Sequence, residues 1–150
     1  MRETLFNWLG QDLTGRRCLD LFAGSGALGM EAASRGAAEV VMVEINRAVY
    51  RALKENTGKL DFRNIALYNE DGLKFASRSN GQFDVIFLDP PFQSDYLGKI
   101  LPLLARLLTP LGLLYVESGS GFEAGAEWTV LKQGKAGAVH YRLFQHTKHD

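Results

Sequence analysis

The sequence predicts a single α/β domain in which helices cover both faces of a mostly parallel sheet. Short apolar runs rich in β-branched residues alternate with amphipathic stretches, which is the pattern of strands joined by helices. A glycine-rich segment from Gly24 to Gly29 follows the first of these runs and precedes a helical stretch. The length of 150 residues, with 46% hydrophobic and 23% charged residues, suits one domain spanning residues 1–150.

The first half of the chain alternates helices and strands. Apolar residues at helical spacing predict a leading helix over residues 1–13. A stretch of small residues predicts a helix over 27–35, which Gly36 ends in the position that favours glycine. Three apolar or β-branched runs and one amphipathic stretch predict three strands (17–22, 39–45 and 65–68) and a further helix (47–60).

The second half completes the sheet. The apolar runs 83–88 and 113–117 predict two further strands on either side of a strongly apolar helix over 96–108. The stretches 128–132 and 139–145 close the chain and predict an antiparallel pair. These elements together predict a seven-stranded sheet that is parallel except for an antiparallel final strand.

The composition excludes several classes of site. A single cysteine, Cys18, rules out an internal disulfide and a multi-thiolate metal site, and all three histidines fall in the last eleven residues, so we expect no metal. No apolar run approaches the ~20 residues of a membrane span, and no signal-peptide pattern opens the chain, so we expect a cytoplasmic protein. Lys and Arg total 17, as do Asp and Glu, and this zero net charge weakens any function that needs strong non-specific attraction to phosphate.

The segment Gly24-Ser25-Gly26-Ala27-Leu28-Gly29 matches the pattern G-x-G-x-x-G between a strand and a helix. Glycine lets a ligand approach the helix N-terminus, whose free N–H groups favour negative charge. Glu44 follows Gly24 by 20 positions at the end of the second strand, a spacing that suits hydrogen bonds to ribose hydroxyls. These features suit a nicotinamide dinucleotide as well as S-adenosylmethionine, and a tight turn that binds nothing is the structural alternative.

Two further acidic residues bear on which cofactor is bound. Asp20 lies four residues before Gly24, where its carboxylate would repel a pyrophosphate but attract the sulfonium and ammonium groups of S-adenosylmethionine. Asp71 follows the third strand and is placed to accept a hydrogen bond from the adenine amino group. It also suits the N-cap of a short helix over 73–76, and both roles can coexist. The sequence therefore favours S-adenosylmethionine.

The tetrapeptide Asp89-Pro90-Pro91-Phe92 follows the predicted strand 83–88. Its two prolines restrict φ and remove two backbone donors, so the segment is stiff and presents carbonyl acceptors. The Asp89 carboxylate and the Pro90 carbonyl can each accept one hydrogen of an exocyclic amino group, which directs the nitrogen lone pair toward an electrophile. Phe92 offers a face on which a flipped base can stack. A strand-ending turn with a core phenylalanine is the structural alternative.

These motifs resemble those of a known family. Asp20-Leu-Phe-Ala-Gly-Ser-Gly-Ala-Leu-Gly29, Glu44 and Asp89-Pro-Pro-Phe92 resemble the motifs of Rossmann-like, class I S-adenosylmethionine-dependent amino-methyltransferases. Arg2-Glu-Thr-Leu-Phe-Asn-Trp-Leu9, Tyr115-Val-Glu-Ser118 and Tyr141-Arg142-Leu143 narrow the resemblance to the RsmD family, bacterial enzymes that methylate N2 of a guanine in small-subunit (16S) ribosomal RNA. The resemblance covers nearly the whole chain.

The resemblance implies a direct, in-line transfer of a methyl group from S-adenosylmethionine to the guanine amino nitrogen. The implied partner is ribosomal RNA or the assembled small subunit, and we expect a monomer. Tyr141 and Arg142 are candidates to lie near the RNA, with a core tyrosine beside a solvated arginine as the alternative. The residues implied to act on the base are Asp89, Pro90 and Phe92, and those implied to hold the cofactor are Asp20, Phe22, Gly24, Ser25, Gly26, Glu44 and Asp71.

The chain departs from the family in one respect. Family members usually carry a basic extension before the segment that begins at Arg2, so either the protein is naturally short or the chain is a fragment with its basic arm missing. In either case we expect poor turnover on isolated RNA. The alternative functions are a DNA amino-methyltransferase, a protein-glutamine methyltransferase, a nicotinamide dehydrogenase and a non-catalytic nucleotide-binding module. The first usually needs a target-recognition region that this length cannot supply, the tetrapeptide of the second more often begins with Asn, and the intact Asp89 argues against the last.

Overall fold

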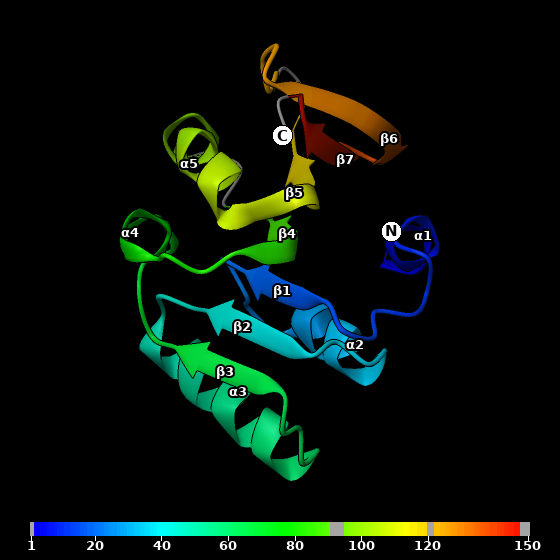
Figure 1. Cartoon of the computed structure of the whole chain (residues 1–150). Helices are drawn as coiled ribbons and strands as arrows, with labels where there is room; N and C mark the ends of the chain where they lie inside the picture. The colour runs from blue at the N-terminus through cyan, green and yellow to red at the C-terminus, as the bar shows by residue number, and fades with distance from the viewer. Residues whose placement is uncertain (1, 91–94, 120–121, 148–150) are drawn as a thin grey trace.

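The computed structural model describes residues 2–90, 95–119 and 122–147. Within these residues, one seven-stranded sheet has the order β3-β2-β1-β4-β5-β7-β6 (Figure 1). Neighbouring strands from β3 to β5 are parallel, and β7 runs antiparallel to both β5 and β6, which confirms the predicted sheet. The strands are β1 (Arg17–Asp20), β2 (Glu39–Val43), β3 (Ile65–Tyr68), β4 (Phe83–Leu88), β5 (Leu108–Ser118), β6 (Trp128–Ala136) and β7 (Val139–His146).

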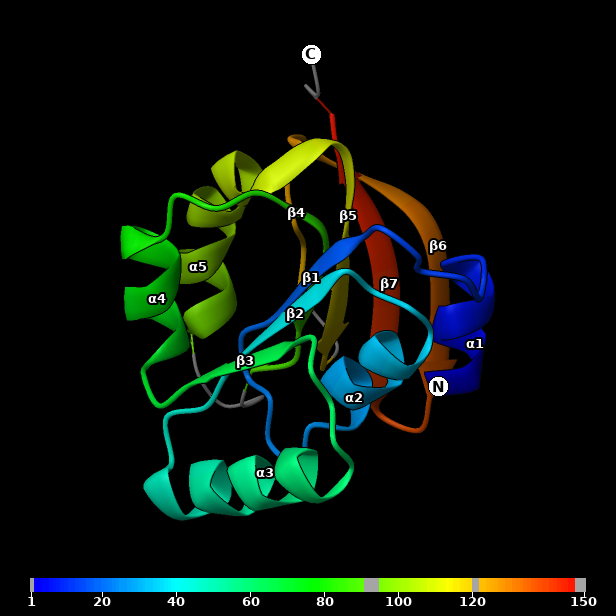
Figure 2. The ribbon, with the colours of Figure 1, turned by 60° about the horizontal axis from the view of Figure 1, so that its bottom comes forward.

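Helices cover both faces of this sheet. They are α1 (Arg2–Trp8), α2 (Ala27–Ser34), α3 (Arg47–Lys59), α4 (Gly72–Arg78) and α5 (Tyr96–Leu104), and a 3-10 turn, η1 (Ala105–Leu107), follows α5. Figures 1 and 2 show α1 and α2 on one face and α4 and α5 on the other. Leu53 of α3 joins the apolar cluster beneath α1 and α2, so α3 belongs to that face. No helix among the described residues is long and apolar enough to cross a membrane.

Alternate residues of the central strands supply two apolar cores. In β4, Val85 and Phe87 join the cluster beneath α1 and α2, whereas Ile86 and Leu88 join the cluster beneath α4 and α5. Successive side chains of a strand point to opposite faces, and all four of these are fully buried. A strand that is buried on both faces needs a nearly unbroken apolar run, which explains why β4 has the bounds predicted from the sequence.

Most predicted elements occur, and the differences lie at their ends. The leading helix predicted over 1–13 stops at Trp8, and shortly afterwards Gly10 and Gln11 adopt positive φ values of 91° and 68°. The helix predicted over 96–108 is α-helical only to Leu104, and the next three residues form the 3-10 turn η1. The strand predicted over 113–117 already starts at Leu108, because that residue pairs with β4.

Four further elements also differ from the prediction at their ends: two are longer than predicted and two are shorter. Strand β6 continues four residues beyond the predicted 128–132, because it pairs with β7 as far as Ala136. The short helix predicted over 73–76 is wider, as Gly72–Arg78. The first two strands, predicted to reach residues 22 and 45, end two residues earlier, at Asp20 and Val43. Their last predicted residues thus belong to the loops at the carboxyl edge of the sheet.

Helix α2 approaches β2 through the last glycine of the glycine-rich segment. A Cβ atom on Gly29 would lie 2.1 Å from Sδ of Met42, a residue that is fully buried in β2. No larger residue fits there unless the core moves. The third glycine of the pattern therefore sets the distance between α2 and the sheet.

Replacing Gly29 with alanine is expected to lower the free energy of unfolding by about 1–3 kcal/mol, the usual cost of overpacking a core. Gly58→Ala is the matched control, because Gly58 is an exposed residue of α3 whose Cβ would meet open space. Alanine at that position is expected to stabilise the protein by about 0.5–1 kcal/mol. Urea denaturation of the two variants measures both values, and equal effects would contradict the packing role of Gly29.

Candidate active site

A pocket of about 310 Å³ lies where the parallel strands end. This edge is where open α/β sheets bind ligands. Three segments at the ends of β1, β4 and β5 contribute to it, together with the first described residue of α1. The lining residues are Arg2, Asp20, Phe22, Ala23, Gly24, Ser25, Ala27, Leu28, Asp89 and Glu117. Five of the predicted site residues are thus brought together around one space: Asp20, Phe22, Gly24, Ser25 and Asp89.

The glycine loop has the backbone geometry that only glycine adopts readily. Gly24 and Gly26 have φ values of 54° and 83°. A Cβ atom on Gly26 would lie 2.3 Å from Cδ1 of Leu53, so this residue packs against α3 instead of lining the pocket. Gly26 is also the N-cap of α2, and no side chain there bonds the first turn. The N–H groups at the start of α2 therefore suit a negatively charged ligand group.

Glu44 lies behind the glycine loop and holds it in place. Its Oε1 accepts a hydrogen bond from the Gly24 N–H (2.8 Å) and its Oε2 accepts one from the Asn46 N–H (2.8 Å). A carboxylate offers about four acceptor positions, so these two bonds leave capacity for ribose hydroxyls. Sequence spacing located Glu44 but gave no sign of its bonds to the backbone.

Asp71 occupies the N-cap position of α4, but its side chain makes no capping hydrogen bond. Instead its Oδ1 accepts a hydrogen bond from the Tyr96 hydroxyl (3.2 Å). The Tyr96 ring in turn meets the ring of Phe22 edge to face, with centroids 5.5 Å apart. Asp71 is therefore joined to the pocket-lining Phe22 through a tyrosine that the sequence analysis did not single out.

The pocket concentrates negative charge. Asp20 is only 2% exposed, and burial raises its pKa to about 7, with smaller contributions from the charges of Asp89, Glu44 and Glu117, while the Phe22 backbone N–H opposes the shift. Asp89 remains partly open to solvent. The surrounding protein, and then Glu117, raise its pKa to about 6. Both carboxyl groups therefore titrate near neutral pH.

Glu117 and Arg2 line the pocket although the sequence analysis did not place them there. The Tyr115 hydroxyl donates a hydrogen bond to Oε2 of Glu117 (2.8 Å), and burial, followed by the charge of Glu117, raises the pKa of Tyr115. The position of Glu117 at the end of a strand beside β4 is a signal that could have identified it. Arg2 gave no such signal, because its place depends on how α1 packs.

The other predicted residues lie in different surroundings. Pro90 is buried directly after Asp89, and Phe92 lies outside the described residues. The Tyr141 ring stacks on Trp8 with centroids 5.5 Å apart, and Arg142 donates a hydrogen bond to the Phe122 carbonyl (3.0 Å). Both candidates for RNA contact are thus engaged within the protein. Among the described residues, no group of three or more His, Cys, Asp and Glu side chains could hold a metal ion.

Known proteins share both the sequence and the architecture. The family described as Conserved hypothetical protein 95 matches residues 1–145. Ribosomal RNA small subunit methyltransferase D of Escherichia coli strain K12 is 40% identical over 152 residues, which span 97% of this chain and 76% of the relative. The Haemophilus influenzae protein of the same name is 40% identical over 153 residues, which span 97% of this chain and 79% of the relative.

Two solved structures extend this comparison. An Escherichia coli chain described as a candidate methyltransferase, yhhF, has a TM-score of 0.90 at 39% identity. The matched region covers 97% of this chain and 83% of the Escherichia coli chain. A conserved hypothetical protein of Streptococcus pyogenes has a TM-score of 0.87 at 29% identity and covers 100% of this chain and 98% of its own. The fold therefore agrees with these relatives over nearly the whole chain.

The raised pKa of Asp20 predicts a pH-dependent stability. The pKa of Asp20 is about 7 in the folded protein and near 3.8 in the unfolded chain. Between about pH 4 and about pH 7 the folded state therefore binds more protons than the unfolded state. The contribution of Asp20 to the free energy of unfolding therefore falls as the pH rises from about 4 to about 7. Asp20→Asn, which cannot ionise, is expected to remove this part of the decline.

Urea denaturation at about pH 5 and about pH 8 measures this difference in both proteins. Asp89 titrates in both, so the comparison isolates Asp20. If the variant lost as much stability between the two pH values as the parent protein, the burial of an ionised Asp20 would not be the cause.

Proposed function

Because the chain belongs to the RsmD-like family of methyltransferases, we propose that it transfers a methyl group from S-adenosylmethionine to the exocyclic N2 amino group of a guanine in 16S ribosomal RNA. The observation that carries this proposal is the pocket itself. The glycine loop, Asp20 and Asp89 line one space, so a cofactor and an amino group can meet there. The names of the relatives support ribosomal RNA as the substrate, free or in the small subunit.

The charges of the pocket fit S-adenosylmethionine better than a dinucleotide. When bound, this cofactor supplies a methyl group on a cationic sulfonium. Asp20, Asp89 and Glu117 suit its positive groups and would repel a pyrophosphate. Glu44 has acceptor capacity for the ribose, and Asp71, which Tyr96 joins to the pocket-lining Phe22, is the proposed acceptor for the adenine amino group.

Asp89 and Pro90 would orient the amino group of the base. The Asp89 carboxylate and the Pro90 carbonyl each accept one amino hydrogen, which turns the nitrogen lone pair away from both oxygens. An amine that gains a methyl group becomes positively charged and must then lose a proton. With a pKa of about 6, Asp89 is mostly ionised at neutral pH, so it can stabilise that charge and accept the proton.

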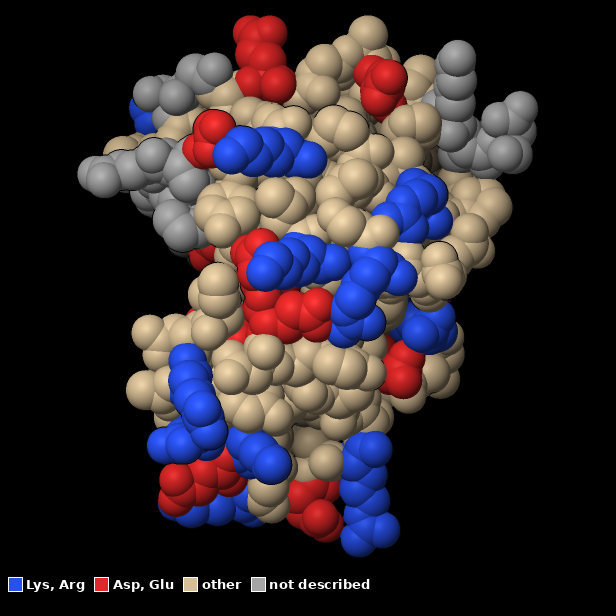
Figure 3. Space-filling view, turned by 90° about the vertical axis from the view of Figure 1, so that its left-hand side faces the viewer, with Lys and Arg blue, Asp and Glu red and all other residues tan. Residues whose placement is uncertain are grey.

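The face covered by α4 and α5 does not provide the RNA-binding surface in this proposal. Figure 3 shows Lys and Arg side chains lying beside Asp and Glu across that face. Arg78 pairs with Glu70 (2.5 Å), and Lys99 pairs with Asp95 (3.4 Å). Such balanced charge gives little attraction to phosphates, so the substrate is expected to approach the pocket edge instead.

The substrate is tested by incubating the protein and methyl-labelled S-adenosylmethionine with small ribosomal subunits that lack the modification. Matched reactions contain naked 16S ribosomal RNA, duplex DNA or subunit proteins. We expect label on N2 of a guanine in the RNA. Label found only in DNA or protein, or on another atom of the RNA, would contradict the proposal.

Asp89→Ala is expected to lower kcat by about 10²–10³, the range for the loss of one preorganised electrostatic contact. Its affinity for the cofactor should stay within a factor of a few, because the glycine loop is untouched and the carboxylates of Asp20 and Glu117 still face the positive groups of the cofactor. Asp89→Asn keeps one acceptor but loses the charge and should be intermediate or similarly poor. Single-turnover kinetics and calorimetry measure these effects, with Glu55→Ala on the exposed side of α3 as the control. A near-normal kcat in Asp89→Ala would exclude the assigned role.

A further inference from the structure

Arg2 is the only cationic residue among those that line the pocket in the described part of the chain. The other charged lining residues are the carboxylates Asp20, Asp89 and Glu117. These three suit the sulfonium and ammonium groups of the proposed cofactor, but they would repel its carboxylate. A pocket for the whole amino-acid half of the cofactor therefore needs a positive group, and Arg2 is the lining residue that can supply one.

The Arg2 guanidinium is weakly engaged within the protein. Among the described residues its only polar contact is an ion pair with Glu31, whose Oε1 lies 3.9 Å from Nε of Arg2, and the Arg2 side chain is 57% exposed. Glu31 already has a closer partner, because Nε of Arg35 lies 3.0 Å from its Oε2. A guanidinium carries five N–H donors in a fork that matches a carboxylate. Arg2 therefore has donors available for a ligand.

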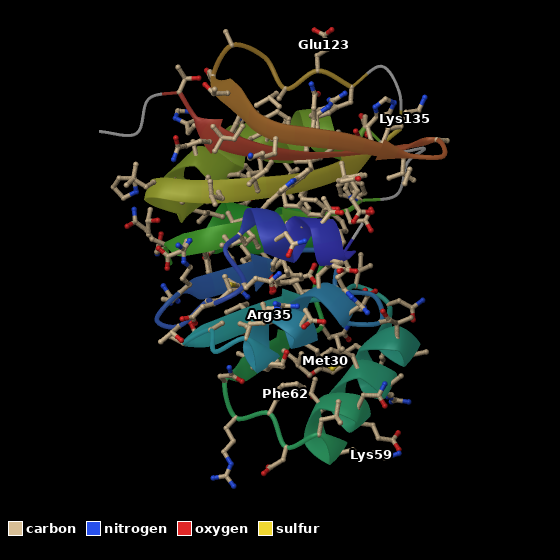
Figure 4. All side chains as sticks on the ribbon, turned by 90° about the vertical axis from the view of Figure 1, so that its right-hand side faces the viewer. Met30, Arg35, Lys59, Phe62, Glu123 and Lys135 are labelled. Carbon is tan, nitrogen blue, oxygen red and sulfur yellow. The ribbon has the colours of Figure 1, made fainter. Side chains whose placement is uncertain are left out.

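Helix α1 holds this position without help from Arg2. Leu5 and Phe6 are fully buried, and the Phe6 ring lies 6.2 Å from the ring of Phe87 in β4. The Arg35 guanidinium covers the Phe6 ring at 4.8 Å. Figure 4 looks onto this face, where α1 lies alongside α2, the helix that carries Met30 and ends just before Arg35. Because apolar packing anchors the helix, replacing Arg2 should leave the fold intact.

We propose that Arg2 binds the carboxylate of the methionine half of the cofactor and makes the site selective for ligands that carry this carboxylate. The inference rests on the proposed function and adds a specificity-determining residue to its site. The carboxylate pairs with Arg2 and with the free N–H groups at the start of α2. The ammonium group pairs with the carboxylates that line the same pocket, Asp20, Asp89 and Glu117. These opposite charges together fix the orientation of the amino-acid half.

Calorimetry with three ligands tests this assignment. S-adenosylmethionine carries both the carboxylate and the ammonium group, decarboxylated S-adenosylmethionine lacks only the carboxylate, and 5′-methylthioadenosine lacks both. The proteins are the parent chain, Arg2→Met, Arg2→Lys and the control Arg63→Met. Arg63 is a suitable control because its side chain is 87% exposed and lies outside the pocket. A thermal melt of each variant checks that the fold is unchanged.

Arg2→Met is expected to weaken binding of S-adenosylmethionine by about tenfold to a hundredfold, the scale for hydrogen bonds to a charged group. Binding of the decarboxylated ligand and of 5′-methylthioadenosine should change by less than about twofold in this variant, because neither presents a carboxylate. Arg2→Lys should restore part of the loss, because a single ammonium replaces the fork. Arg63→Met should bind all three ligands as the parent does.

Several outcomes would overturn the assignment. If Arg2→Met weakened the binding of all three ligands equally, Arg2 would act through the shape of the pocket and not through the carboxylate. If Arg2→Met bound all three ligands as the parent does and bound only RNA more weakly, the guanidinium would contact the RNA substrate instead of the cofactor. Either result leaves the proposed function standing. Failure of the parent chain to bind any of the three ligands would instead reject the proposed function together with this inference.

Discussion

The hydrogen bond from the Gly24 N–H to the Glu44 carboxylate (2.8 Å) is the contact on which the geometry of the site depends. It ties the glycine loop to the end of β2, while the second oxygen of Glu44 holds the Asn46 N–H at the start of α3. Gly26 then packs against Leu53 of the same helix. The loop, strand β2 and helix α3 therefore form one unit, which gives the first turn of α2 a fixed direction toward the pocket.

The concentration of carboxylates at this edge costs stability and favours ligand binding for the same reason. Asp20 is 2% exposed and shares its pocket with Asp89 and Glu117. The raised pKa values of Asp20 and Asp89 show that their ionised forms are unfavourable in the protein. A cationic ligand offsets both the lost hydration and the mutual repulsion of these charges. Part of the affinity for such a ligand thus comes from its compensation of these unfavourable charges.

Sequence reasoning succeeded where the structure depends on neighbours in the chain. Strands β3 and β4 have the predicted bounds, because each is a short apolar run between turns. Spacing also placed Glu44 at a strand end, but it could not reveal which donors its oxygens meet. Tyr96 and Glu117 were missed because each reaches the site through contacts between segments far apart in the sequence, namely the bond from Tyr96 to Asp71 and the pairing of β5 beside β4. Periodicity and motif spacing carry no information about such contacts.

Strand β7, which runs antiparallel to β5 and β6, connects two elements that contribute charged residues to the pocket. Tyr141 of β7 pairs with Glu117 of β5, and its ring stacks on Trp8 of α1. Gly134 of β6 leaves the space for that ring, since a Cβ atom there would lie 2.5 Å from it. Because β7 runs antiparallel to β5, it begins at the edge where β5 ends. A single tyrosine can therefore contact the strand that carries the acidic Glu117 and the helix that carries the cationic Arg2. Strand β7 thus links β5 to α1, the two elements that carry Glu117 and Arg2 at the pocket.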